Sequence, residues 1–291
     1  MNNDNMKPAL NYSEQLETLR KRGLIINNDA QAINILRFTN YYRLSAYSLG
    51  LRKDDVFFPG STIEQIYDIY CFDEKLRHLF FEVIEPIEIR LRAEISYHLS
   101  TNYGNIAHLN PELVTDKKKH LAFLSLYYSG LNASSATPCV KHNIEKYGEL
   151  PIWAAVETLT FGALSKFYGN LKTGIQKPIA RTFNSDVRRF PGWLESLCEL
   201  RNRCAHSNRL YNISLTKNVK LYPNVFLIDD KEHIQNRIFP RLVVIKRIYN
   251  GTGKWSYFFN ELKKLINENA ESINLHHLGM PEDWLDLIDN A

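Results

Sequence analysis

Helical periodicity dominates the pattern of apolar and polar positions along this chain. The clearest segment covers residues 61–101, where apolar side chains return every three or four positions; Pro86 within it is expected to kink the helix or divide it in two. A second apolar stripe predicts a helix over 193–208 and consists of Trp193, Leu194, Leu197, Cys198 and Leu200. Both segments are typical of helices that bury one face.

Shorter helices are predicted on both sides of these two segments. They cover 13–23, a stretch beginning at Asp29, and 140–148, 151–171, 175–183, 231–249 and 254–269. The small-residue stretch 129–136 predicts an exposed loop, and 220–228 a short extended segment. We therefore expect an all-α protein with an N-terminal helical extension (1–60), a helical core (61–212) and a mainly helical C-terminal extension (213–291).

Composition fits this picture without adding a function. The 291 residues are 44% apolar and 23% charged, which is ordinary for a globular protein. Net charge is +4, from 36 Lys and Arg against 32 Asp and Glu. This balance excludes a uniformly basic coat but permits a local groove that binds phosphate, so nucleic-acid binding has to be argued from clustering.

The cysteine spacing and the hydropathy of the chain indicate whether to expect a metal site, a disulfide framework, a signal peptide or a membrane span. The cysteines form no CxxC pair and have no regular spacing, so we expect neither zinc nor a disulfide framework; they are Cys71, Cys139, Cys198 and Cys204. The first residues lack the apolar stretch of a signal peptide, and no apolar run is long enough for a membrane span. We expect a cytoplasmic protein with no membrane association, no metal and no cofactor.

Arg201, Asn202 and His206, at the end of the second helix, form the strongest candidate site. Arginine carries a fixed charge in a fork that matches phosphate, and histidine exchanges a proton near neutral pH. Residues five apart lie about 140° apart around a helix, so the long arginine stem must bring its fork toward the imidazole. Such groups can hold an RNA phosphodiester and move the proton of its 2′-hydroxyl. In the alternative, Arg and His are only solvent-exposed polar side chains on one face of the helix.

A second pair, Arg92 and His98, lies on the first long helix. Arg201 is followed by Asn202, whose amide can contact phosphate, whereas Arg92 is followed by Ala93, which offers no polar group. A catalytic role is therefore one of three alternatives. In the second, i,i+4 pairs of Glu88 with Arg92 and of Arg90 with Glu94 stabilise the helix. In the third, Arg90 and Arg92 hold RNA phosphates without taking part in the chemistry.

Several aromatic and basic residues are candidates for RNA contact. They are Tyr41, Tyr42, Arg43, Arg90, Lys117, Lys118, Lys119, Arg188, Arg189, Arg203 and Arg209. The tyrosines can stack on bases or pack between helices. The lysine run can contact phosphate or simply form a solvated face.

Five stretches of this sequence resemble known bacterial proteins. Residues 201–206 resemble the active motif of the HEPN superfamily, which is arginine, a polar residue, further residues and histidine. Residues 12–24, 40–47, 85–92 and 278–284 resemble Abi-like proteins, the abortive-infection family that includes AbiD and AbiF; they contain Tyr12-Ser13-Glu14-Gln15-Leu16, Asn40-Tyr41-Tyr42-Arg43-Leu44, Glu85-Pro86-Ile87-Glu88 and Leu278-Gly279-Met280-Pro281. The ordered set runs over most of residues 11–285.

This resemblance implies an HEPN-like helical bundle and a role in antiphage defence, as a toxin that degrades RNA. It also implies a homodimer that brings two motifs together, and a small non-coding RNA as a bound partner. From the residues we hypothesise metal-independent cleavage of RNA, in which His206 acts as general acid or base, Arg201 neutralises phosphoryl charge and Asn202 orients the phosphate or the imidazole. The rival hypotheses are an RNA-binding module that does not cleave, and a helical adaptor that binds no RNA.

Overall fold

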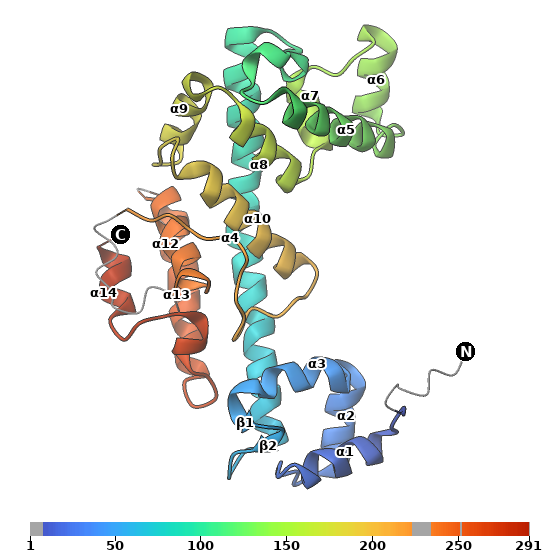
Figure 1. Ribbon diagram of the computed structural model, residues 1–291, viewed down its shortest axis with the longest axis vertical. Helices are drawn as coiled ribbons and strands as arrows, with labels where there is room; N and C mark the ends of the chain where they lie inside the picture. The colour runs from blue at the N-terminus through green and yellow to red at the C-terminus, as the bar shows by residue number, and fades with distance from the viewer. Residues whose placement is uncertain (1–7, 223–233, 251, 291) are drawn as a thin grey trace.

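The computed structural model describes residues 8–222, 234–250 and 252–290 of the chain. Its axis is helix α4 (Ile63–Tyr103), whose 41 residues correspond to a rod of about 60 Å (Figure 1). The buried stripe of α4 follows the predicted spacing and includes Ile66, Ile69, Phe72, Leu76, Phe80, Ile84, Ile87, Leu91, Ile95 and Leu99. Helices from before and after it in the chain pack on this rod, so α4 is the common support of the fold.

Pro86 lies inside α4 but does not divide it, contrary to one of the two outcomes expected from the sequence. Proline lacks an N–H, so the carbonyl of Glu82 loses its helical donor. Glu82 is exposed, and solvent can serve that carbonyl. Because the buried side chains around the proline, including Val83 and Ile87, are packed into the core, tertiary packing outweighs the lost bond.

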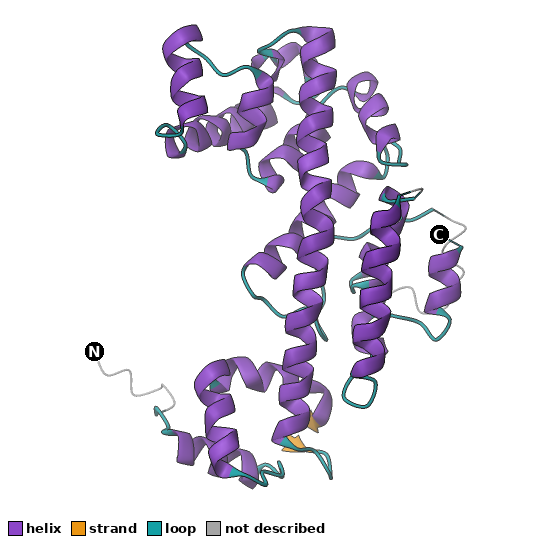
Figure 2. Ribbon diagram, turned by 180° about the vertical axis from the view of Figure 1, so that it is seen from behind, coloured by secondary structure: helices purple, strands orange, loops and turns teal. Residues whose placement is uncertain are grey.

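The N-terminal helices form a group at the beginning of α4 (Figures 1 and 2). They are α1 (Tyr12–Lys21), α2 (Asp29–Thr39), α3 (Tyr41–Ser45) and the 3-10 helix η1 (Ala46–Leu51). A short antiparallel hairpin follows, in which β1 (Arg52–Lys53) pairs with β2 (Val56–Phe57). This hairpin is the only sheet of the described residues, and the predicted all-α class is confirmed.

The other end of α4 is surrounded by a cluster of short helices. They are η2 (Ala107–Leu109), η3 (Pro111–Leu113), α5 (Lys117–Ala133), α6 (Pro138–Tyr147), α7 (Ile152–Ala155), η4 (Val156–Thr158), α8 (Phe161–Asn170) and α9 (Thr173–Thr182). The predicted helix over 151–171 is thus divided into three pieces, and Thr160 caps the last of them by accepting a bond from Ala163 N at 3.2 Å.

The predicted loop over 129–136 is wrong in its first half, because α5 continues through Ala133. The small residues there serve close packing. A Cβ at Gly130 would lie 2.5 Å from the carbonyl oxygen of Thr158, so only glycine lets α5 approach η4 this closely. Small side chains therefore mark a helix contact at this point.

Helix α10 (Phe190–Ala205) lies across α4 and α8 and completes the core. The last part of the chain forms α12 (Phe239–Ile248), α13 (Gly253–Glu268), the 3-10 helix η6 (Leu275–Leu278) and α14 (Trp284–Asp289), with α13 packed beside α4 (Figure 1). Of the extended segment predicted at 220–228, residues 220–222 form no strand and 223–228 lie outside the described residues. The helix predicted over 231–249 is interrupted: residues 234–235 are helical, 236–238 are not, and α12 follows, while 231–233 also lie outside the described residues.

No helix in the described ranges combines the length and the apolar character that a membrane span requires.

The division of the chain into three parts, with boundaries after residues 60 and 212, stays a prediction.

Candidate functional site

Helix α10 presents the candidate residues at its C-terminal end. Its apolar stripe is buried against α4 and α8, which fixes the helix along its length. The helix ends at Ala205, three residues earlier than predicted, so His206 is the capping residue and lies just beyond the last turn. The His206 N–H still donates to the carbonyl of Asn202 at 3.0 Å, whereas Ser207 has a φ of 54°, which ends the helical path. The imidazole is therefore exposed at the end of a rigid helix.

Arg201 is anchored by a buried carboxylate on α4. Its Nε lies 3.2 Å from Glu88 Oε2, while Glu88 Oε1 lies 2.6 Å from a terminal nitrogen of Arg92. Glu88 is buried and bridges two guanidinium groups that are 109 residues apart in sequence, which is the difference between positions 92 and 201. The Arg201 side chain remains 31% exposed, so its guanidinium is held by Glu88 without being enclosed.

Asn202 acts on the same fork. Its Oδ1 accepts a hydrogen bond from Arg201 Nη1 at 3.2 Å, and its Nδ2 lies 3.6 Å from Cys198 Sγ. Burial raises the pKa of the Cys198 thiol, with Arg201 acting in the opposite direction. Asn202 therefore holds the arginine in place, a contact that the sequence did not predict.

The turn after His206 is tied to the N-terminal helices. Arg43 Nη1 on α3 donates to the carbonyl of Ser207 at 2.7 Å. Arg209 donates to the carbonyl of Ala46 at the beginning of η1, and burial lowers the pKa of its guanidinium. Arg43 reaches from α3 to this turn, and Arg209 reaches from the turn back to η1. The two hydrogen bonds together fix the turn that carries His206.

A buried carboxylate on α4 fixes the continuation of the same turn. Asp73 Oδ1 accepts from the backbone N–H of Leu210 at 2.9 Å and of Tyr211 at 2.7 Å. Its Oδ2 accepts from the hydroxyl of Tyr47 at 2.7 Å and from Arg77. Burial raises the pKa of the Asp73 carboxyl, against the effect of Arg77. The path of the chain beyond His206 is therefore set by α4.

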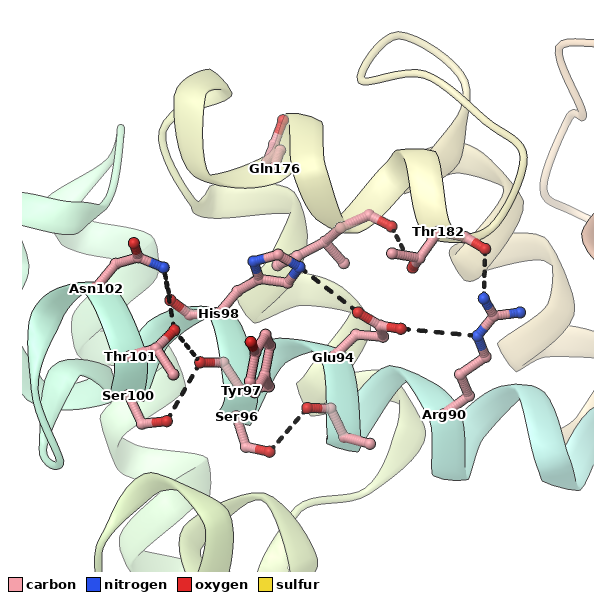
Figure 3. A network of polar contacts seen from close by, with 12 residues as sticks. Arg90, Glu94, Ser96, Tyr97, His98, Ser100, Thr101, Asn102, Gln176 and Thr182 are labelled. Atoms are coloured by element: carbon pink, nitrogen blue, oxygen red, sulfur yellow. Dashed lines mark hydrogen bonds and ion pairs between the residues drawn. The ribbon is translucent and has the colours of Figure 1, made fainter.

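The two residues of the second predicted pair have different partners, and Figure 3 shows those of His98. His98 Nε2 lies 3.6 Å from Glu94 Oε2, on the side of α4 that faces α9, and Glu94 also lies 3.9 Å from Arg90 Nε. Arg92 turns instead toward Glu88, and donates to the carbonyls of Val156 at 3.2 Å and Leu159 at 3.1 Å. The i,i+4 pairs of the structural alternative are present, and Arg92 closes the end of η4.

Arg90, a candidate for phosphate contact, is engaged within the fold. Its guanidinium donates to the carbonyl of Thr182 and lies 4.7 Å from the centre of the Phe183 ring (Figure 3). Arg189, before α10, is held likewise by Asp186 at 2.5 Å and by the ring of Tyr222 at 4.0 Å. These two arginines belong to the packing around α9 and the beginning of α10.

The remaining predicted RNA contacts fall into separate places. Lys117, Lys118 and Lys119 are exposed in the first turn of α5, where Asp116 caps the helix, and Lys117 lies 2.7 Å from Glu112. Helices α3 and α5 lie at opposite ends of α4 (Figure 1), so the lysines do not join Tyr41, Tyr42 and Arg43. Arg188 is exposed at the beginning of α10, whereas Arg203 lies near its end, 3.7 Å from Glu199.

Sequence reasoning assigned no site role to Glu88 and did not mention Asp73. Each is a charged residue on the buried stripe of α4, with arginine four positions later. A carboxylate in an apolar stripe needs a partner, so this pattern was a usable signal.

One family comparison gave a match. The model of the family described as Abi-like protein matches residues 34–212, more than half of the chain, and the match includes both α4 and α10. Searches among curated proteins and solved structures found no match.

Proposed function

The chain belongs to the Abi-like protein family, a family of abortive infection in antiphage defence, and we propose that it acts there as a metal-independent endoribonuclease. Its substrate is single-stranded RNA. The observation that carries the proposal is the end of α10, where an anchored but partly exposed Arg201 stands five residues before an exposed His206.

The chemistry uses the two kinds of group that stand at this helix end, an imidazole and a guanidinium. The imidazole of His206 takes the proton of the ribose 2′-hydroxyl, and the 2′-oxygen forms a bond to the adjacent phosphorus. The bond from phosphorus to the 5′-oxygen breaks, and that oxygen receives a proton from an imidazolium. Arg201 neutralises the charge that gathers on the phosphoryl oxygens. The products carry 2′,3′-cyclic phosphate and 5′-hydroxyl ends, and no water, oxidant or metal is consumed.

We propose that a second copy of the chain completes the site. His98 is turned to Glu94 and Arg92 is engaged by Glu88 and two carbonyls, so neither supports completion of the site within one chain. A homodimer that pairs the two α10 ends supplies two imidazoles, one as base and one as acid. Activity per molecule should then fall on dilution below the dimer dissociation constant.

The protein also binds RNA as a partner in this proposal. A small non-coding RNA that occupies the arginine-rich end of α10 would hold the toxin inactive until infection. The charges on or beside that end are Arg43, Arg201, Arg203 and Arg209.

Cleavage of labelled single-stranded RNA in the presence of EDTA tests the proposal. Wild type should release fragments with 2′,3′-cyclic phosphate ends, identified by mass spectrometry, and His206→Ala should not. His142→Ala, which removes an exposed histidine on α6, is the matched control and should cleave as wild type does. RNA binding without cleavage by wild type would favour the non-cleaving module, and absence of binding would favour the adaptor.

A further inference from the structure

Two aromatic side chains at the junction of α2 and α3 are unusually exposed. Phe38 and Tyr42 each expose 86% of their surface, more than any other large apolar or aromatic residue of the described chain. Burial in the core is the usual fate of such side chains, so two of them standing open within five residues need an explanation.

The junction that carries them is rigid. Asn40 has a φ of 67°, and its side chain accepts from the backbone N–H of Tyr42 at 2.8 Å, which caps α3. Leu44 and Tyr41, in the same short helix, pack toward the core. The exposed rings therefore project from a fixed backbone, so a ligand that covers them has only their side chains to order.

The junction is also fixed to the candidate site. Tyr42 is followed by Arg43, whose guanidinium donates to Ser207, the residue after His206. This hydrogen bond thus joins the segment that carries the exposed rings to the segment that carries the imidazole. Arg209 makes a second tie, from the same turn to Ala46. Both ties come from arginines, so the surroundings are cationic, which matches a polyanion.

Resting on the proposed function, we infer that Phe38 and Tyr42 form a platform on which unpaired bases of the RNA stack, next to the phosphate held at the end of α10. Bases stack on aromatic rings whatever their identity, because each presents a π-face. The platform therefore selects single-stranded over double-stranded RNA, whose bases are already stacked, and sets no strict sequence preference.

Binding of a fluorescent single-stranded RNA 12-mer tests this inference, measured on a His206→Ala background so that the RNA stays intact. Phe38→Ala and Tyr42→Ala should each weaken binding about 5- to 100-fold. Tyr42→Phe and Phe38→Tyr keep a ring and should bind within about twofold of the parent. The slope of affinity against salt should not change, because no charge is removed. Tyr257→Ala, an exposed aromatic residue on α13, is the matched control.

Three results would overturn the platform. Unchanged RNA affinity in both alanine variants would do so. A switch of oligomeric state in these variants, with RNA affinity unchanged, would assign the rings to a protein interface. Equal weakening by Tyr257→Ala would make the effect nonspecific. Failure of the proposed function is distinguishable, because it appears as absence of RNA cleavage by the protein with His206 intact, whereas the platform is tested by RNA binding on the His206→Ala background. Circular dichroism checks that the variants keep their helices.

Discussion

Glu88 on α4 and Arg201 on α10 are joined by an ion pair of 3.2 Å, and the same carboxylate binds Arg92 at 2.6 Å. This relationship changes the role of the second motif. Arg92 does not face His98; it shares with Arg201 the buried carboxylate that sets the direction of the Arg201 fork. The arginine of the candidate site is thereby fixed to the central helix of the fold.

Removal of Glu88 should cost both stability and activity. Glu88→Ala leaves Arg92 without its partner in a site with little exposure, so we expect a loss of about 2–4 kcal/mol in the free energy of unfolding. Urea unfolding measures it. Glu94→Gln, which breaks a more exposed pair on the same helix, is the control and should cost less than about 1 kcal/mol. Equal effects of the two variants would contradict the anchoring role.

Arg43 should affect turnover more than affinity. Its bond to the Ser207 carbonyl positions the turn that carries His206, so Arg43→Ala should lower kcat about tenfold with KM for RNA nearly unchanged. Arg43→Gln keeps a side-chain N–H donor and should recover part of the loss. A rise in KM at constant kcat would instead mean that Arg43 binds a phosphate of the RNA.

Asp73 should control the order of the chain after His206. Asp73→Ala removes the acceptor of two backbone N–H groups and leaves Arg77 buried without its carboxylate, so we expect a loss of about 3–5 kcal/mol. Asp73→Asn keeps an acceptor oxygen and should cost less. The protection of the Leu210 and Tyr211 amides from hydrogen exchange measures the local loss of order. Unchanged protection of these amides in Asp73→Ala would contradict the assignment.

Stability should fall in acid because of His108. Burial lowers the pKa of this imidazole from 6.5 to about 4. Above pH 6.5 the ring is neutral in both the folded and the unfolded chain. Between pH 6.5 and 4 the unfolded chain takes up a proton that the folded chain does not, so stability is lost as the pH falls, by up to about 3 kcal/mol.

His108→Phe tests this assignment. It keeps a ring against Tyr127, whose centre lies 5.0 Å from that of the imidazole, and removes the titrating group. The difference in unfolding free energy between pH 7 and pH 4.5 should shrink in this variant. An unaltered difference would place the acid sensitivity elsewhere.

The sequence predicted the elements that repeat a strong pattern. The apolar stripe of α4 was clear over its whole length, and the stripe of α10 was equally regular, so both helices were found. The errors lie where local signals were read without their packing. Pro86 does not divide α4, although division is one of the two outcomes that the sequence predicts, and the small residues before Ala133 predict a loop because the contact of Gly130 with Thr158 is long-range.

The surroundings of the candidate site could be predicted only in part for the same reason. Arg201, Asn202 and His206 are close in sequence, so a local motif was enough to select them. Glu88 and Arg43 reach this site from distant segments, and only the folded chain brings them there. The predicted RNA contacts lie in separate places, because a basic residue such as Lys117 or Arg189 does not reveal from sequence alone which surface it lies on.

The central claim is that catalysis belongs to the imidazole at the end of α10. Its most direct test is the initial rate of RNA cleavage in EDTA by His206→Ala and His98→Ala, measured side by side at equal concentration. The account predicts a loss of at least about 100-fold for His206→Ala and less than about threefold for His98→Ala. A full rate in His206→Ala, or an equal loss in His98→Ala, would contradict it.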